Sequence, residues 1–182
     1  ADVDPAWATN VKQAIDLAGQ TLPHLQSVLF DRLGPQLTGL GVLSASTVAD
    51  FGVSGVAAHA TGVDLDLRRS SPYLAYSELS SVLTPVLRSD GDALARFECL
   101  FEHLTLSIAL IDACLPHLGE LNGAPVNVKL PKVLRAPEGS TYVNTEGPLG
   151  TSGYYLVSRG KAMPWRLKMR TASFNNAQAL SQ

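Results

Sequence analysis

One long run of apolar residues with a helical repeat constrains the fold of this chain more than any other feature of its sequence. Within residues 89–118, apolar side chains recur at alternating steps of three and four, the spacing of one helix face. Residues 106–110 are apolar on nearly every side, and such a helix packs against more than one neighbour. The run predicts a central helix over about 89–116, with Asp90 and Asp92 at the positive end of its dipole. The face consists of Leu94, Phe97, Phe101, Leu104, Ile108, Ile111, Leu115 and Leu118.

The residues before this helix predict a second helix and then an irregular region. Residues 1–33 carry an apolar stripe behind a capping Asp4, and Pro23 is expected to kink or split that helix. Residues 34–88 are irregular and contain several glycines. A short helix is expected there at 46–51, with Ser46 or Thr47 as its cap and Gly52 as its stop. Alternation of apolar and charged side chains over 62–69 indicates a half-buried strand or an extended loop.

The last third of the chain predicts β-structure, within residues 126–170. Thr141–Glu146 is one candidate strand, and Gly153–Arg159 with Pro164–Arg170 predicts a hairpin around Gly160. The polar tail, 171–182, has the composition of a helix start. Together these patterns predict an α+β fold in a single partial domain over 1–182, with a mainly helical core and a carboxy-terminal hairpin region.

Composition excludes several classes of protein. The 182 residues include 14 Lys and Arg against 16 Asp and Glu, a net charge of −2. This balance argues against a nucleic-acid partner, which needs an excess of cations. Charged residues make up 16% of the chain, well below the roughly 25% of average globular proteins. A chain so poor in charge is expected to bury its surface in a partner or to be a piece of something larger.

Neither a membrane segment nor a targeting segment is expected. The long weakly charged stretch 33–63 is broken by glycines and by Pro35, and the amino terminus has neither a cationic nor an apolar region. Cys99 and Cys114 are 15 residues apart in the predicted central helix, so about 22 Å separates them and a disulfide is excluded. Two reduced thiols without a Cys-x-x-Cys pair fit a cytoplasmic compartment and exclude a closed zinc site within the chain.

Each candidate site also has a structural interpretation. Asp64 and Asp66 would share a strand face and suit a metal ion, but Arg68 on the same face favours a solvated charge cluster. Tyr154 and Tyr155 suit either a pocket lining or cross-strand packing.

Cations and histidines are equally open to a structural interpretation. A ladder of cations suits either an anion site or a protected strand edge: Arg166, Lys168 and Arg170. His103 and His117 are about 21 Å apart along the predicted helix and cannot share a metal, while His24 and His59 are isolated in the sequence. The residues show no nucleophile motif and no phosphate-binding loop.

A series of short motifs nevertheless follows a characteristic order along the chain. The first part of the series comprises Gly41-Val42-Leu43, Gly52-Val53-Ser54-Gly55, Gly62 to Arg68, Pro72-Tyr73-x-x-Tyr76, and Gly91-Asp92 with Arg96 and Glu102. The second part comprises Glu146-x-Pro148-x-Gly150, Gly153 to Ser158, Pro164-Trp165-Arg166, Arg170 and Ser173-Phe174-x-Asn176-x-Gln178. The order of these motifs resembles a known family, the D-type polypeptide of proton-pumping NADH–quinone oxidoreductase (respiratory complex I), known in mitochondria as the 49 kDa subunit. The resemblance covers nearly the whole chain.

The resemblance implies a fold related to the large subunit of nickel–iron hydrogenases and a place in a peripheral arm on the cytoplasmic side of a membrane. It implies no cofactor in this chain. Quinone and an iron–sulfur cluster of a neighbouring subunit would be the redox groups. The implied partners are the small iron–sulfur subunit, the C-type polypeptide of the complex and the membrane arm. A working nickel–iron hydrogenase is excluded because its site needs two Cys-x-x-Cys pairs.

Several positions depart from the family pattern. The family's quinone-binding loop and tyrosine lie in its amino-terminal half, so no quinone contact is carried over to this chain. Charged family residues are replaced at His59, Ala95 and Leu100 and in the run Leu149-Gly150-Thr151, and a helical stretch is shortened around 131–139. Removing buried ion pairs as pairs is often neutral for stability, so the fold is expected to survive these changes.

Two hypotheses follow, from different classes. The first is a part of a quinone-reducing subunit that contributes scaffold and contacts with other subunits, without catalysis by this chain alone. The second is a non-catalytic structural or assembly protein that kept the hydrogenase-like core. In the first case the candidate interface residues are in two segments rich in polar and aromatic groups: Asp64, Asp66, Arg68, Tyr73, Tyr76, Tyr154, Tyr155, Arg166 and Arg170.

Overall fold

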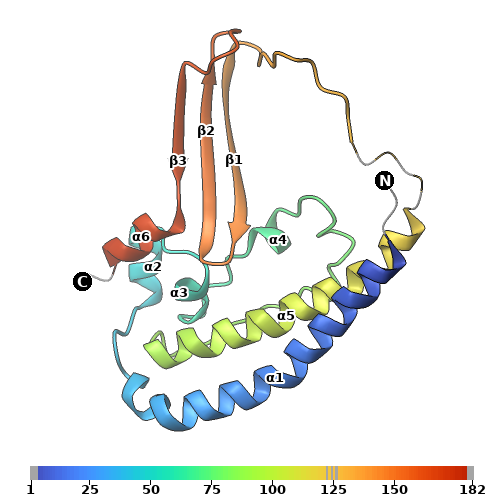
Figure 1. Ribbon diagram of the computed structural model, residues 1–182. Coiled ribbons are helices and arrows are strands. Elements are labelled where there is room, and N and C mark those ends of the chain that lie inside the picture. The colour runs from blue at the N-terminus through green and yellow to red at the C-terminus, as the bar shows by residue number, and fades with distance from the viewer. Residues whose placement is uncertain (1–3, 122, 124, 126, 180–182) are drawn as a thin grey trace.

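The computed structural model describes residues 4–121, 123, 125 and 127–179 and confirms the predicted α+β class. Figure 1 shows an upright three-stranded sheet standing on a base of helices. The elements are α1 (Pro5–Leu37), α2 (Ala45–Phe51), α3 (Val56–His59), α4 (Leu67–Ser70), α5 (Ala93–Glu120), β1 (Gly139–Gly147), β2 (Gly150–Ser158), β3 (Arg166–Arg170) and α6 (Ala172–Ala179).

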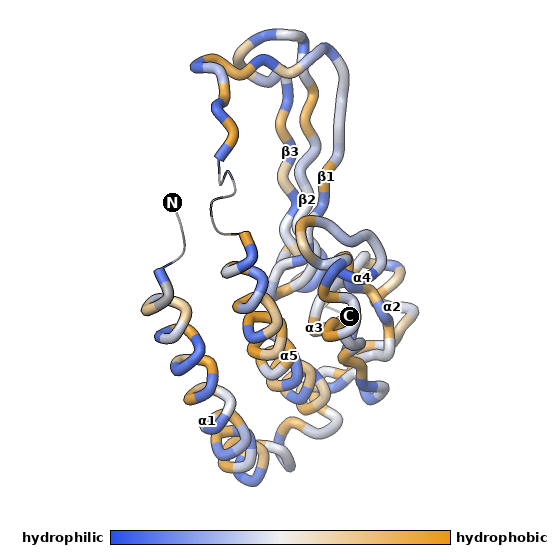
Figure 2. Tube along the Cα trace, turned by 90° about the vertical axis from the view of Figure 1, so that its right-hand side faces the viewer, coloured by the Kyte–Doolittle hydropathy of each residue, from blue (hydrophilic) through white to orange (hydrophobic). Residues whose placement is uncertain are grey.

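The two long helices, α1 and α5, lie side by side and run in opposite directions (Figures 1 and 2). Helix α5 begins four residues later than predicted because Asp92 caps it: the carboxylate accepts a hydrogen bond from the backbone N–H of Ala95 at 2.8 Å. Helix α1 is capped by Asp4, as expected, but it is not split at Pro23 and continues to Leu37. Proline removes one backbone hydrogen bond, but the helix continues through both Pro23 and Pro35.

The short elements between the long helices differ in part from expectation. Helix α2 is capped by Ser44 rather than by Ser46 or Thr47, and Gly52 ends it in the left-handed conformation with φ 62°. The alternative of a strand over 62–69 is wrong, because residues 63–66 are irregular, as the alternative of a loop expects, and residues 67–70 are helical. Asp66 caps α4 by accepting from the N–H of Arg68, so the chain turns into a helix there and the alternation of faces ends.

The sheet is antiparallel in the order β1-β2-β3. The expected hairpin around Gly160 is formed by β2 and β3, and a second, tighter hairpin joins β1 to β2 at Pro148 and Leu149. Strands β1 and β2 are longer than predicted, and β3 begins two residues later than expected. Helix α6 occupies most of the predicted helical tail, of which residues 180–182 lie outside the described residues.

The core consists of two buried apolar clusters at the base of the sheet. Helix α5 contributes Ala95, Cys99, Leu106 and Leu110 to the first of them. The buried face is therefore rotated relative to the predicted stripe. Phe101 of that stripe is buried, whereas Phe97, Leu104 and Ile111 are exposed by 38%, 49% and 42%. This rotation leaves an apolar face of α5 open in the described part of the chain.

By length and composition, α5 would suffice to cross a membrane. This observation is weak, because the core helix of a soluble protein passes the same test, and α5 packs against α1 and α3.

Candidate functional site

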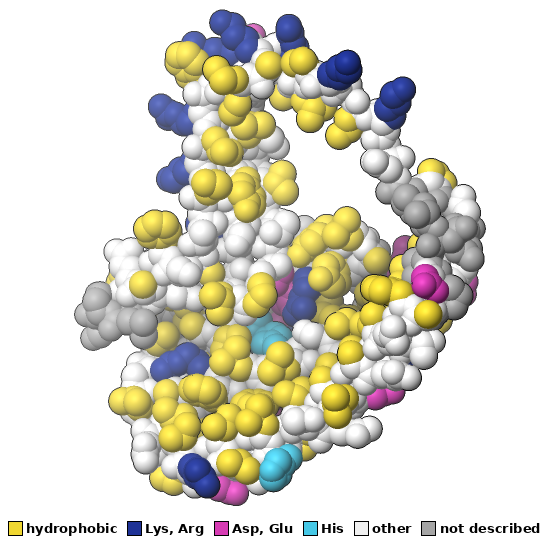
Figure 3. All heavy atoms as spheres, viewed as in Figure 1, with side chains coloured by type: hydrophobic (Ala, Val, Ile, Leu, Met, Phe, Trp, Pro, Cys, Tyr) yellow, Lys and Arg dark blue, Asp and Glu magenta, His cyan; other side chains and the backbone are white. Residues whose placement is uncertain are grey.

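Two cavities along α5 meet at a cluster of charged and polar side chains. One, of about 480 Å³, lies between α5, residues 55–59 and the turn after β1. The other, of about 440 Å³ and almost wholly apolar, lies between α1, α5 and residues 74–79. Arg68, Tyr76 and Ser107 line both cavities. Figure 3 shows cationic, acidic and histidine side chains meeting where the sheet rests on the helices.

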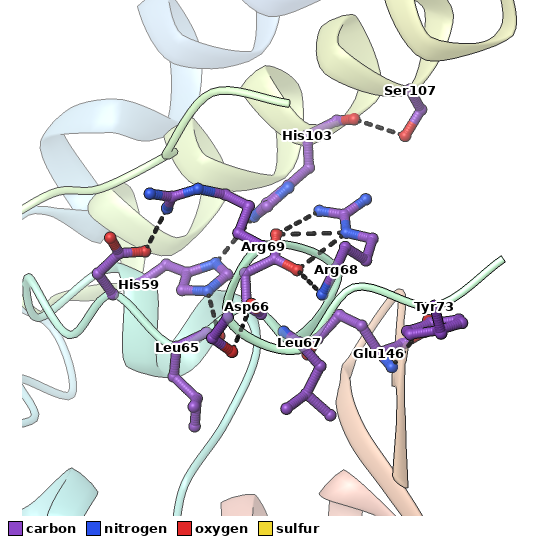
Figure 4. A network of polar contacts seen from close by, with 12 residues as sticks. His59, Leu65, Asp66, Leu67, Arg68, Arg69, Tyr73, His103, Ser107 and Glu146 are labelled. Carbon is purple, nitrogen blue, oxygen red and sulfur yellow. Dashed lines mark hydrogen bonds and ion pairs between the residues drawn. The ribbon is translucent and has the colours of Figure 1, made fainter. Parts of the chain in front are cut away.

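The centre of this cluster is an ion pair between Asp66 and Arg68 (Figure 4). Nη2 of Arg68 donates to Oδ2 of Asp66 at 2.7 Å, and Nε donates to Oδ1 at 3.0 Å. The side chain of Asp66 is 6% exposed and that of Arg68 is 13% exposed, so the pair is shielded from water. Burial alone would raise the pKa of the Asp66 carboxyl, but the hydrogen bonds and charge of Arg68 outweigh burial and lower the pKa. Asp66 therefore stays ionised.

A pair of histidines lies beside the ion pair. Nδ1 of His59, in α3, is 2.9 Å from Nε2 of His103, in α5, and Nε2 of His59 is 2.9 Å from the carbonyl oxygen of Leu65. A carbonyl oxygen only accepts, so in a neutral His59 Nε2 carries the hydrogen and Nδ1 accepts from His103. Burial, with the charges of His59 and Arg68, lowers the pKa of His103 to about 4. His103 is neutral at physiological pH.

A third contact fastens the sheet to this cluster. The Tyr73 hydroxyl accepts from the backbone N–H of Glu146, in β1, at 3.1 Å and donates to its carbonyl oxygen at 3.3 Å. The Glu146 carboxylate accepts from the N–H of Leu67 at 3.2 Å, and burial raises its pKa. The ring of Tyr76 packs edge-on against that of Tyr73, with centroids 5.1 Å apart. The loop from Asp66 to Tyr76 is thereby held between α5 and β1.

The structure separates the two aspartates that the sequence placed together. Asp64 is exposed and forms an ion pair with Arg69 at 2.6 Å. The expectation of a solvated cluster is therefore wrong for Asp66, because α4 turns its side chain inward. Among the described residues, no group of three or more His, Cys, Asp or Glu side chains is placed to hold a metal ion. Cys99 and Cys114 are free, and burial raises the pKa of Cys99 to about 11.

The candidates in the sheet fall into two groups. Tyr154 is opposite Val143 and Met169, and Tyr155 is opposite Tyr142 and Lys168, so the tyrosine pair takes part in cross-strand packing. Arg170 turns back to the helical base, where it donates to the carbonyl oxygen of Gly52 at 2.8 Å and to the side chain of Asn175 at 3.0 Å. Arg166 and Lys168 stay exposed.

Sequence reasoning missed the histidine pair and the role of Glu146 in this cluster. His59 and His103 are 44 residues apart, and Glu146 is 79 residues from Leu67, whose N–H it binds. No local pattern connects such positions. The motif that contains Glu146 was the available signal, although its contact with Tyr73 follows only from the packing of β1 on the loop.

Comparison with known proteins decides the family. A family model described as "Respiratory-chain NADH dehydrogenase, 49 Kd subunit" matches residues 1–134 and 130–182. The chain belongs to this family. The resemblance inferred from the motif order is thus confirmed.

Individual members of the 49 kDa subunit family match along the whole chain. A protein of Streptomyces griseus subsp. griseus, named as a D-type polypeptide of NADH-quinone oxidoreductase, is 50% identical over 186 residues, covering 100% of this chain and 46% of that protein. A Geobacillus thermodenitrificans protein, also named as a D-type polypeptide of NADH-quinone oxidoreductase, is 34% identical over 182 residues, covering 98% of this chain and 48% of that protein. The chain therefore spans about half the length of the curated relatives that it matches.

A solved structure shares the fold as well as the sequence. A chain of the membrane-bound sulfane sulfur reductase, an archaeal respiratory membrane complex, superposes with a TM-score of 0.87 at 30% identity. The match covers 97% of this chain and 48% of that chain. The α+β arrangement seen here is thus part of a larger polypeptide in that complex.

Proposed function

We propose that this chain forms part of the quinone-reducing 49 kDa subunit of an NADH–quinone oxidoreductase. Its role would be to provide scaffold and contacts with other subunits around the quinone chamber, in the peripheral arm on the cytoplasmic side of the membrane. The observation that carries the proposal is the 50% identity, over the whole chain, to a protein named for that subunit. A fold related to the large subunit of nickel–iron hydrogenases belongs to the same proposal.

In this role the chain itself holds no redox group. Electrons would pass from an iron–sulfur cluster in the neighbouring small subunit to quinone. This chain would contribute only the support of the chamber wall. Its contacts would be with that iron–sulfur subunit, with the C-type polypeptide and with the membrane arm.

The charged cluster supports a scaffold role. Asp66 and Arg68 pair with each other, and Tyr73 binds Glu146 in β1. These three candidate residues therefore act inside the chain and hold the loop from Asp66 to Tyr76 in place. The candidates left for contacts with other subunits are exposed: Asp64, Tyr154, Tyr155 and Arg166.

The proposal is tested by purifying the tagged product of the native gene from its own cells. The polypeptide mass and the co-purifying proteins are read together. We expect a polypeptide of about twice this chain, with iron–sulfur and membrane subunits attached, and no quinone reduction by the isolated 182-residue chain. A product of this chain's own mass without respiratory partners would instead support a non-catalytic structural or assembly protein.

Arg68→Ala and Arg170→Ala variants test the two candidate segments in the same preparation. Each change should lower the yield of assembled complex, because Arg68 fixes the loop and Arg170 fixes the base of β3. An unchanged yield of assembled complex in both variants would contradict a role of the loop around Arg68 and of the hairpin ending at Arg170 in assembly.

A further inference from the structure

The net charge of −2 hides a strong separation of charge along the chain. Residues 127–170, which we call the β-arm, contain eight Lys and Arg against two Glu, a net charge of +6. The rest of the chain has six Lys and Arg against fourteen Asp and Glu, a net charge of −8. Figure 3 shows the cations of the arm along one edge of the sheet and around its free end, away from the helical base. Seven of the eight cations are Lys129, Lys132, Arg135, Arg159, Lys161, Arg166 and Lys168. The eighth, Arg170, turns back to the base.

The register of the strands gives the arm two unlike faces. Side chains directly opposite one another in neighbouring strands point to the same side of a sheet. One face is apolar, because Val143, Tyr154 and Met169 are mutual neighbours there, beside Leu156 and Leu167. The other face combines aromatic and cationic side chains: Tyr142, Tyr155, Arg166 and Lys168.

Both faces are open in the part of the chain that the structure describes. On the apolar face Val143 is 54% exposed and Met169 is 63% exposed, and Tyr142 on the opposite face is 52% exposed. At the free end, the guanidinium of Arg159 lies 3.4 Å from the ring centre of Trp165, which is itself 60% exposed. A sheet normally buries at least one face against another layer, so this arm lacks a layer that it needs.

We infer that the β-arm inserts into an acidic cleft on another protein chain, which contacts both of its faces. The charge of +6 selects a partner surface rich in Asp and Glu, and the Trp, Tyr, Met and Arg side chains are the types enriched in protein interfaces. The inference rests on the proposed function only in taking that chain to be a subunit of the same complex.

The two faces also argue against other partners. A lipid surface or a nucleic acid that bound the cationic face would leave the apolar face in water. A membrane that took up the apolar face would leave Arg166 and Lys168 pointing away from its headgroups. A cleft in a protein accommodates both faces, with apolar side chains against one and carboxylates against the other.

The inference is tested by cross-linking in the intact complex. A photoreactive phenylalanine analogue is placed at Tyr154, on the apolar face, and in a second variant at Tyr142, on the aromatic and cationic face. After irradiation, mass spectrometry identifies the attached peptides. We expect both positions to cross-link to the same protein chain. The peptides attached at Tyr142 should be rich in Asp and Glu. Attachment to lipid or RNA alone, or no attachment at either position in an assembled complex, would overturn the inference.

Charge reversal supplies a second readout. Arg166→Glu together with Lys168→Glu should lower the cross-linking yield about tenfold or more, because like charges then face the partner. The matched control is Arg32→Glu, which reverses an exposed cation on α1 and should leave the yield unchanged. Both variants should keep the circular dichroism spectrum of the parent. An unchanged yield in the double variant would contradict the acidic cleft.

These outcomes differ from a failure of the proposed function. If the chain does not purify with respiratory subunits at all, the proposed function fails. If the complex purifies intact and the arm neither cross-links to a protein nor responds to charge reversal, only the inference about the arm fails.

Discussion

Asp64 and Asp66 are two residues apart and yet occupy opposite environments. Asp66 is shielded with Arg68, whereas Asp64 is exposed with Arg69. Separating a buried ion pair leaves an unpaired charge away from water, while an exposed pair is already weakened by solvent. The same residue type at these two positions therefore provides a matched pair of variants.

Asp66→Ala should lower the free energy of unfolding by about 3 kcal/mol, because Arg68 is left buried without a partner. Asp64→Ala should change it by less than about 1 kcal/mol. Urea denaturation followed by circular dichroism measures both. Equal effects of the two changes would show that the Asp66 pair is not shielded in solution.

The histidine pair predicts a dependence of stability on pH. The pKa of His103 falls from 6.5 to about 4 on folding, so the unfolded chain binds more protons than the folded chain between these values. The contribution of neutral His103 to stability is complete above pH 6.5 and is lost as the pH falls toward 4.

His103→Gln should therefore flatten the fall in unfolding free energy between pH 6.5 and about 4, relative to the parent chain. The control is His117→Gln, because His117 is 61% exposed and lies at the end of α5. Denaturation at several pH values gives the slopes. A parent slope retained in His103→Gln would contradict the burial of this imidazole.

At the scale of elements, the sheet is docked on the helical base through two glycines. A Cβ on Gly150 would lie 2.5 Å from Oγ of Ser54 and 2.8 Å from the backbone nitrogen of Gly55, and its φ is +121°. The same Ser54 hydroxyl accepts from the N–H of Thr151 at 3.0 Å. The turn between β1 and β2 therefore contacts the start of α3 through backbone atoms, which a side chain would separate.

Gly150→Ala should lower the free energy of unfolding by about 3 kcal/mol, through the unfavourable φ together with overpacking. Gly160→Ala, at φ +70° with no atom within 4 Å, carries the backbone cost alone and should lower it by about 1 kcal/mol. Thermal unfolding compares the two. A Gly150 variant no less stable than the Gly160 variant would disprove the close docking.

Helix α5 is anchored to the rest of the base at its amino terminus. One carboxylate oxygen of Asp92 caps the helix through Ala95, and the other accepts from the N–H of Gly39 at 2.7 Å. Asp92→Ala should lower the free energy of unfolding by about 2 kcal/mol, at the upper end of capping effects, since two backbone donors lose their acceptor. The neighbouring Asp90→Ala is the control in urea denaturation, and a similar loss there would argue against a specific cap.

At the scale of the whole molecule, apolar surface on α5 and a basic sheet arm are both left open. The chain spans 46% of its Streptomyces griseus relative, and these open surfaces are the ones that a larger assembly would cover. Apolar surface in water favours association by about 25 cal/mol per Å² buried. The isolated chain should therefore self-associate.

Leu104→Lys should reduce that self-association with little change in stability, because Leu104 is already 49% exposed on the open face of α5. Leu17→Lys changes an isolated exposed leucine on α1, at 66% exposure, and should leave association as it was. Sedimentation velocity at several concentrations measures both. Equal effects of the two variants would indicate that the α5 face is not the contact.

The sequence by itself determined the elements whose pattern is local. The repeat of threes and fours around Phe101 specified α5, the alternation after Pro164 specified β3, and Gly160 marked the hairpin between β2 and β3. The motif order by itself also identifies the family. These features are readable because helix and strand periods are fixed by the backbone within a few residues.

Only the tertiary structure decided which face of α5 is buried and which polar groups meet. Leu104 and Ala95 both lie on α5, and Ala95 is the buried one because Ala60 and residues 79–86 cover its side of the helix. His59 meets His103, and Glu146 meets Tyr73, through packing of segments 44 and 73 residues apart. Contacts of this kind depend on how whole elements dock, and no short-range pattern of residue types encodes that.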